Sequence, residues 1–322
     1  MITSEGLDLI QAKTEQVLAQ VRTVVVGQEA VLQSLLAAIY CQGHVLLEGV
    51  PGTAKTLMVR ALARAMSLDF GRVQFTPDLM PSDVIGTNIY DLSRSQFVLR
   101  KGPVFTDLLL GDEINRSPAK TQAALLEAMQ ERRCTIDGEP YPLSPNFTVF
   151  ATQNPIEYEG TYPLPEAQLD RFMMKVVVTY PTPEEEERLL ERYNQGQEPH
   201  NVEHSAIQPV MSAAEIERCR SAVKGLTMRP ELVTYVRELV GATRASEEIM
   251  VGCGPRGGIH LLLAAKAMAA FAGRDFVTPD DVQSMVIPTL RHRIVLQPEA
   301  EANGQTPEEA IRAILQRVSV PR

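Results

Sequence analysis

The sequence predicts an α/β protein in which a five-stranded, mainly parallel sheet is sandwiched by helices and is followed by a small all-α domain. In the first half of the chain, short apolar runs of the strand type alternate with amphipathic helical patterns. That alternation is typical of βα units that build a parallel sheet. Beyond Tyr180 the pattern is helical throughout, and 322 residues are enough for about two domains of ordinary size.

Five apolar runs predict the strands of the sheet. They occupy residues 44–48, 72–76, 107–112, 147–152 and 173–180. Two other segments interrupt the alternation and predict inserted β-hairpins. These lie at residues 87–105 and 134–142, and the second has Asp137-Gly138 at its turn.

The strand pattern ends at a Tyr-Pro-Thr-Pro sequence, and we place a domain boundary there. Residues 1–180 then form an N-terminal helix plus the α/β domain, and residues 181–322 form a helical domain. Three helices of the second domain begin with Thr-Pro and two acidic residues, at Thr182, Thr278 and Thr306. Thr suits the cap, Pro the first helical position, and acids the positive end of the helix dipole. We therefore interpret the acidic run after Thr182 as a solvated helix start and not as a metal site.

Composition and charge exclude several classes of protein. Hydrophobic residues make up 44% and charged residues 22%, which excludes a collagenous or wholly disordered chain. The formal charge of −9 has the wrong sign for a protein that covers a nucleic-acid backbone over a broad surface. Apolar runs are too short to span a membrane, the N-terminal residues do not resemble a signal peptide, and the four cysteines form no Cys-x-x-Cys pair. We expect a cytoplasmic protein without a membrane span and without a nucleic-acid partner.

The strongest functional signal is a glycine-rich loop between a predicted strand and a predicted helix. A strand, a tight loop and a helix N-terminus direct backbone N–H groups at one point, where they can hold phosphate oxygens. Lys55 would reach the β- and γ-phosphates, and the Thr56 hydroxyl would ligate Mg²⁺. Ala54 stands where the usual pattern has glycine, and we expect this position to tolerate a β-carbon if its backbone is helical. The predicted nucleotide-binding residues are Gly49, Val50, Pro51, Gly52, Thr53, Ala54, Lys55, Thr56 and Leu57.

Polar residues follow two later strands. Asp112 and Glu113 end an apolar strand, at the sheet edge where open α/β sheets bind ligands. Asp112 would orient Mg²⁺, and Glu113 would polarise the attacking water. Asn154 follows the next strand, where an amide can bind both a γ-phosphate oxygen and that water. Alone, its Asn-Pro sequence would indicate only a turn.

Two arginines complete the predicted catalytic set. Arg171 precedes the last strand, at an edge of the domain from which it could reach the nucleotide of a neighbouring subunit. A salt bridge to Asp170 or Glu166 is the alternative interpretation. Arg256 lies at a helix entrance, where a cation opposes the dipole and favours an anionic partner such as phosphate. That position suggests that the second domain closes over the nucleotide.

Together these motifs resemble the MoxR family of AAA+ ATPases. The resemblance runs from about residue 25 to residue 296 and implies a P-loop sheet followed by a helical lid domain. It implies Walker A (Lys55, Thr56), Walker B (Asp112, Glu113), sensor 1 (Asn154), an arginine finger (Arg171) and sensor 2 (Arg256). The two hairpins resemble the helix-2 and pre-sensor-1 inserts of that clade. Gly257 and Gly258 depart from the residues usual at the sensor 2 helix start.

The function implied by the resemblance is Mg²⁺-dependent ATP hydrolysis by a homo-oligomeric ring, a hexamer by analogy. Hydrolysis would drive chaperone-like remodelling or maturation of a client protein, with a partner that carries a VWA domain. A nucleic-acid motor or loader and a metal-chelatase motor subunit are the alternatives within the clade, and a scaffold that binds ATP without hydrolysing it is an alternative outside it. Arg94, Arg100 and Lys101 on the first hairpin could line a basic pore for the nucleic-acid alternative.

Histidines give no competing site. The sequence from His200 to His204 spells a zinc-peptidase pattern, but its proline-rich and polar surroundings favour a linker. His44 and His260 lie in apolar surroundings and are expected to be packed, neutral side chains.

Overall fold

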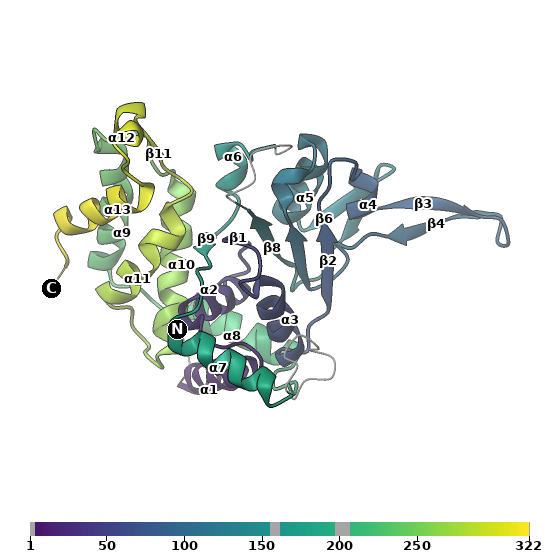
Figure 1. Cartoon of the computed structure of the whole chain (residues 1–322), viewed down its shortest axis with the longest axis horizontal. Coiled ribbons are helices and arrows are strands. Elements are labelled where there is room, and N and C mark those ends of the chain that lie inside the picture. Colours follow the sequence, from purple (N-terminus) through teal and green to yellow (C-terminus); the bar gives the residue numbers. More distant parts are fainter. Residues whose placement is uncertain (1–3, 155–161, 197–206, 322) are drawn as a thin grey trace.

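The computed structural model describes residues 4–154, 162–196 and 207–321. Its centre is a five-stranded sheet with the strand order β2-β5-β8-β1-β9, in which every neighbouring pair is parallel (Figure 1). The strands are β1 (Val45–Glu48), β2 (Phe70–Gln74), β5 (Leu108–Asp112), β8 (Thr148–Gln153) and β9 (Met174–Val177). The predicted five strands are therefore confirmed, with small shifts at their ends.

The three central strands, β5, β8 and β1, are buried on both faces of the sheet, which is why they are largely apolar runs. Leu108 and Leu110 of β5 join one buried cluster, and Leu109 between them joins the other. The first cluster contains the helices of the N-terminal segment and of the lid, and the second contains α5. The helices of this domain are α1 (Ser4–Arg22), α2 (Glu29–Tyr40), α3 (Lys55–Ala65), α4 (Pro81–Ile85), α5 (Ala119–Glu131) and α6 (Glu166–Leu169), with a 3₁₀ turn η1 (Ile114–Arg116).

Both predicted hairpins are present. The first, formed by β3 (Gly86–Asp91) and β4 (Gln96–Lys101), projects far from the body of the molecule (Figure 1). The second is formed by β6 (Arg133–Ile136) and β7 (Glu139–Pro142), and its turn residues Asp137 and Gly138 both have positive φ. Asn88 Nδ2 of the first hairpin donates to Asp137 Oδ2 of the second at 2.9 Å. The two inserts are therefore joined side by side.

The second half of the chain is helical but contains one short sheet. Its helices are α7 (Pro183–Asn194), α8 (Ala213–Gly225), α9 (Pro230–Ala245), α10 (Pro255–Phe271), α11 (Pro279–Leu290), α12 (Pro298–Ala302) and α13 (Pro307–Arg317). The expectation that strands do not recur here was wrong, because β10 (Ile249–Val251) and β11 (Val295–Leu296) pair antiparallel. Each is so short that its pairing with a distant segment, and not its own pattern, makes it a strand. Capping boxes at Thr182, Thr278 and Thr306 confirm the three predicted helix starts.

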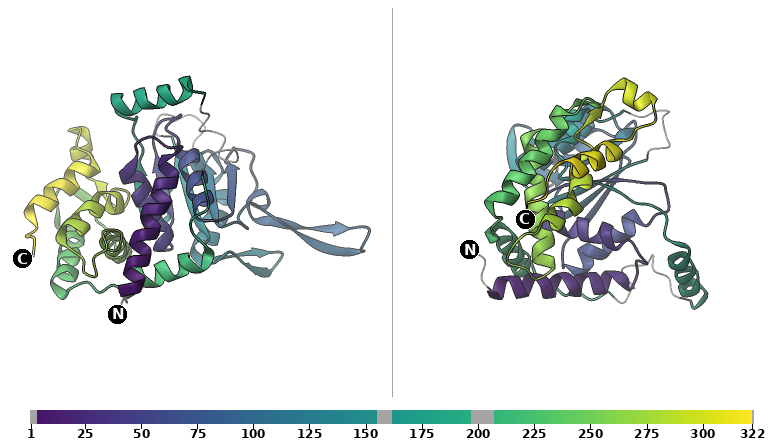
Figure 2. Two further views of the ribbon diagram at one scale, coloured as in Figure 1. Left: turned by 90° about the horizontal axis from the view of Figure 1, so that it is seen from below. Right: turned by 90° about the vertical axis from the view of Figure 1, so that its left-hand side faces the viewer.

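The first helix of this half does not lie with the others. Figure 2 shows α7 beside the C-terminal end of α1, away from α9 to α13. The guanidinium of Arg192 donates to the carbonyl oxygens of Arg22 and Thr23 at 3.3 and 3.0 Å. The predicted boundary at residue 180 therefore places α7 in the second domain, although α7 contacts the first domain. The boundary stays a prediction.

Candidate functional site

The glycine-rich loop links β1 to α3 at the carboxyl edge of the sheet. Gly49 lies so close to β9 that a Cβ at this position would overlap the carbonyl oxygen of Val178. Gly52 has a φ of +82°, a region open to glycine at little cost. The sequence therefore needs glycine at both positions to bring the loop against the sheet.

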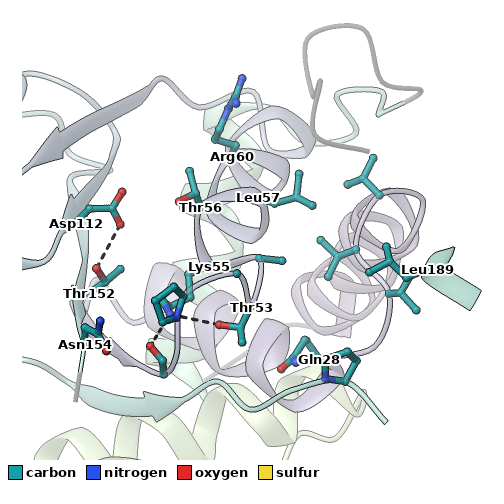
Figure 3. Close-up of a pocket in the computed structure, with 18 of the residues that line it drawn as sticks. Gln28, Thr53, Lys55, Thr56, Leu57, Arg60, Asp112, Thr152, Asn154 and Leu189 are labelled. Carbon is teal, nitrogen blue, oxygen red and sulfur yellow. Dashed lines mark hydrogen bonds between the residues drawn. The ribbon is translucent and has the colours of Figure 1, made fainter. Parts of the chain in front are cut away.

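The ammonium group of Lys55 points back into this loop (Figure 3). It donates to the carbonyl oxygens of Gly49 and Val50 at 2.8 and 2.7 Å, and to Thr53 Oγ1 at 3.3 Å. Burial lowers the pKa of Lys55, and the nearby carboxylates of Asp112 and Glu113 oppose that shift. A cation held only by neutral oxygens is suited to exchange them for an anion.

The backbone at Ala54 does not meet the condition under which a β-carbon was expected to be tolerated, because it is not right-handed helical. Ala54 has φ 60° and ψ 20°, which is the left-handed region. A residue with a β-carbon loses roughly 1–2 kcal/mol in that conformation. The loop therefore holds Ala54 in a conformation that glycine would adopt more easily. The β-carbon is accommodated at this position, but with local backbone strain.

A cavity of about 640 Å³ lies in front of the loop, a volume within the usual range for small-molecule sites. The structure brings most of the predicted residues together around it. Of those, the lining includes Gly49, Pro51, Gly52, Thr53, Ala54, Lys55, Thr56, Leu57, Asp112, Glu113 and Asn154. Val50 does not line the cavity and contributes its carbonyl oxygen to Lys55 instead.

The two acids at the end of β5 are held by neighbouring strands. Asp112 accepts a hydrogen bond from Arg72 Nε at 2.7 Å and one from Thr152 Oγ1 at 3.3 Å. Glu113 has a left-handed φ of 58°, and its N–H donates to the same Thr152 hydroxyl at 2.8 Å. Thr152 on β8 thus fixes the backbone and one carboxylate of this pair.

The Glu113 carboxylate has two further partners. Gln74 Nε2 donates to its Oε2 at 2.9 Å, and Arg116 Nε lies 3.1 Å from the same oxygen. Sequence analysis missed Gln74 and Arg72, which both lie on β2. No sequence signal pointed to them, because the pairing of β2 with β5, which puts Gln74 in register with Asp112, is decided by the tertiary structure.

Thr56 and Asp112 lie on facing sides of the cavity, one on α3 and one on β5 (Figure 3). Among the residues described, no group of three or more His, Cys, Asp or Glu could enclose a metal ion. One hydroxyl and one carboxylate fit Mg²⁺, which keeps several waters and takes phosphate oxygens as ligands. The donor set is therefore suited to a magnesium ion that arrives with a phosphate ligand.

The opposite end of the cavity is apolar and was not expected from the sequence. Val24, Val25 and Val26 line it together with Leu189 and Tyr193 of α7. Gln28 Nε2 donates to the Thr179 carbonyl oxygen at 2.9 Å and ties this wall to the chain that leads into α7. The cavity thus combines a polar end, at the glycine-rich loop and the two acids, with an apolar end that could hold a planar ring.

The two predicted arginines do not reach this cavity. Arg171 and Arg256 line a second pocket of about 140 Å³, with His44, Met129, Gln130 and His260. The expected closure of the second domain over the nucleotide stays a prediction, and in this structure Arg256, whose Nη1 lies 3.2 Å from Asp170 Oδ2, does not line the large cavity. The reason is that the carboxylate of Asp170, next to Arg171, holds the guanidinium there.

Arg171 itself is unpaired within the described part of the chain. Its guanidinium makes neither a hydrogen bond nor an ion pair there, and the Asp170 carboxylate is shared by Arg256 and Arg293. The alternative salt bridge to Asp170 or Glu166 is therefore not formed.

Burial lowers the pKa of His44 to about 4 and that of His260 to about 3, which agrees with packed, neutral rings.

Comparisons with known proteins place this geometry in a family. Residues 44–174 match the family model of the ATPases associated with various cellular activities, and residues 241–314 match the AAA lid domain. The chain is 42% identical to Chaperone MoxR1 of Mycobacterium tuberculosis, over 99% of this chain and 85% of that protein. It is 34% identical to Protein MoxR of Paracoccus denitrificans, over 88% of each. The chain belongs to the MoxR family of AAA+ ATPases.

The fold of a MoxR ATPase is shared with a solved structure. A crystal structure of a proposed ATPase from Cytophaga hutchinsonii superposes with a TM-score of 0.90 at 44% identity, and covers 99% of this chain and 98% of that one. This MoxR protein is an ATP hydrolase.

Within the described residues, none of the helices combines the length and apolarity that crossing a membrane requires. Pro155, next to Asn154, and the segment from His200 to His204 lie outside the described residues.

Proposed function

We propose that this MoxR ATPase works as a homo-oligomeric ring, a hexamer by family analogy, that hydrolyses ATP at the boundary between subunits. One observation carries the proposal. The cavity with Lys55 and the pocket with Arg171 and Arg256 have no lining residue in common. The two arginines therefore suit the nucleotide of an adjacent copy better than that of their own chain.

Each residue of the large cavity has a task in this proposal. The loop N–H groups and Lys55 would hold the phosphates, with Lys55 exchanging the carbonyl oxygens of Gly49 and Val50 for the β- and γ-oxygens. Glu113 would accept a proton from the attacking water, and Asn154 would orient that water. Thr56 and Asp112 would hold Mg²⁺, which when bound neutralises charge on the phosphate oxygens.

The arginines would supply the remaining positive charge. An arginine finger stabilises charge on the transferred phosphoryl group and in characterised cases is worth about 10³–10⁵ in rate. Arg171 suits that role because its guanidinium makes no hydrogen bond or ion pair within the described part of its own chain. Arg256 lines the same pocket and would approach the same neighbouring nucleotide.

The projecting hairpin supports a protein client. Ile89, Tyr90, Leu92 and Phe97 are exposed on it, Leu92 by 85% and Phe97 by 72%. An apolar tip of this kind suits an extended protein segment better than a phosphate backbone. We therefore propose chaperone-like remodelling of a client, with a VWA-domain protein as partner and a cytoplasmic location, in line with the four free cysteines. The Mycobacterium tuberculosis relative bears the name chaperone.

Complementation between two inactive variants tests the shared site. Glu113→Gln removes the base but leaves Arg171 available to a neighbour, and Arg171→Ala leaves an intact cavity that lacks the finger. Each variant alone should release phosphate at least 100-fold more slowly than wild type. Mixed and allowed to exchange subunits, the two should regain a substantial fraction of the wild-type rate, because some Arg171→Ala cavities then face an intact arginine.

A third variant is the control. Mixing Glu113→Gln with Arg171→Ala/Lys55→Ala should restore nothing, since the second subunit can no longer hold the phosphates. If the first mixture also stays inactive while rings form, Arg171 does not act across a subunit boundary and the proposal is wrong.

A further inference from the structure

Arg293 belongs to the lid but binds the first domain. It follows α11, yet its side chain is only 1% exposed, and its Nε donates to Asp170 Oδ1 at 2.8 Å. Its Nη2 also donates to the backbone oxygens of Asp170, at 3.1 Å, and of Phe172. These two carbonyl groups lie on either side of Arg171.

The remaining donors complete the attachment. Arg293 Nη1 donates to the Met173 carbonyl oxygen at 3.1 Å, and Nη2 lies 2.7 Å from His260 Nδ1. The neighbouring His292 ring contacts the Phe172 oxygen at 3.1 Å. A single guanidinium therefore connects the lid to the segment 170–173. Lysine could not replace it, because its ammonium lacks a planar fork with donors at several fixed directions.

The lid is shaped around this side chain. A Cβ at Gly257 would overlap Cys253 Sγ and would lie 2.8 Å from Arg293 Cδ. The glycine that departs from the usual residues at this helix start therefore makes room for the Cys253 thiol and for Arg293. This packing gives a physical reason for glycine at position 257.

We propose that Arg293 is a positioning residue for Arg171, which makes the placement of this arginine depend on the lid of its own subunit. The inference rests on the proposed action of Arg171 across the subunit boundary. Arg293 fixes the backbone on both sides of Arg171 and leaves the Arg171 side chain free. A shift of the lid would therefore move the finger out of the neighbouring site, so that the lid of one subunit controls hydrolysis in the next. A displacement of about 1 Å at such a site can lower the rate by about 10²-fold.

The complementation experiment described above can show in which of the two subunits Arg293 is required. Arg293→Lys is introduced either into the Glu113→Gln subunit, which donates the finger, or into the Arg171→Ala subunit, which receives it. In the donor, the change should lower the restored rate at least tenfold. In the recipient it should leave the restored rate within about twofold, because that subunit has no finger to position. Binding of a fluorescent ATP analogue should be unchanged in both.

Arg291→Lys is the matched control. Arg291 lies two residues away and pairs with Glu308 within the lid, at 3.2 Å. This variant should leave the restored rate unchanged in either subunit, and melting temperatures should be compared for all variants.

The outcomes separate the two proposals. Equal loss in donor and recipient would indicate a general structural role and overturn the inference, as would no loss in either. If the unmodified pair shows no restoration, the shared site is wrong and the inference falls with it.

Discussion

At the scale of single residues, the two carboxylates of the cavity are held by partners on strand β2 and on the turn η1. Arg72 binds Asp112, and Gln74 with Arg116 binds Glu113. A carboxylate that accepts two such bonds is less available as a base. The proposed base therefore has to exchange partners before it can polarise water.

Substitution of Gln74 tests whether the partners of Glu113 restrain its action as a base. Gln74→Ala removes a hydrogen bond worth about 1 kcal/mol to a partly exposed carboxylate, which corresponds to roughly fivefold in rate. We expect the basal ATPase rate at saturating ATP to rise by about that factor, as measured by phosphate release. The double variant Gln74→Ala/Glu113→Gln should show no rise. A lower rate in Gln74→Ala would instead mean that Gln74 supports the working position of Glu113.

At the scale of secondary-structure elements, α7 forms a wall of the cavity although none of its residues is buried. Its start is fixed by a capping box, in which Glu185 N donates to Thr182 Oγ1 and Thr182 N donates to Glu185 Oε2. Its end is attached to α1 by Arg192. Because both ends of α7 are attached, Leu189 is held at the cavity although α7 buries no residue in a core.

Leu189 and its neighbour Leu190 provide a matched pair of variants. Leu189 lines the cavity, whereas Leu190 is 64% exposed and does not. Leu189→Ala should weaken ATP binding about three- to tenfold, because partial burial of a leucine is worth roughly 1 kcal/mol. Leu190→Ala should leave the affinity unchanged in the same calorimetric titration. Equal effects of both changes would show that α7 does not contact the nucleotide.

At the scale of the whole molecule, buried polar side chains join segments that are far apart in the chain. Arg220 of α8 is 1% exposed and donates to the Ile39 carbonyl oxygen and to Asn146 Oδ1. His44 accepts from Val149 N–H through Nδ1 at 2.9 Å, and its Nε2 lies 3.1 Å from the Met129 oxygen. The His44 proton is therefore on Nε2, and the ring is neutral in this network.

Protonation of His44 should destabilise the fold. Its pKa is lowered to about 4 by burial, from 6.5 in the unfolded chain, so the unfolded state binds the proton more readily. The stability is fully present above pH 6.5 and is lost as the pH falls toward 4, by up to about 1.4 kcal/mol per pH unit for each such histidine. Urea unfolding between pH 7.5 and 5 should show this decline, and His44→Asn should make it shallower. Identical slopes for the two proteins would contradict this assignment.

The sequence by itself determined the parts of this protein that depend on local patterns. The five strands, the phosphate loop, the acids after β5 and the helix starts at Thr182, Thr278 and Thr306 follow from periodicity, glycine placement and capping residues. The structure gathers the residues predicted for this loop, except Val50, and the two acids around one cavity, because the carboxyl ends of parallel strands share an edge.

Only the tertiary structure decided the rest, since it depends on contacts between distant segments. The left-handed backbone of Ala54 results from the closure of the whole loop, and the pairing of β10 with β11 joins residues separated by two helices. Arg72 and Gln74 reach the acids from another strand, and Arg293 reaches Asp170 from the lid. No local pattern encodes such contacts, because the partner of a buried polar side chain is chosen by how the elements pack and not by its neighbours in sequence.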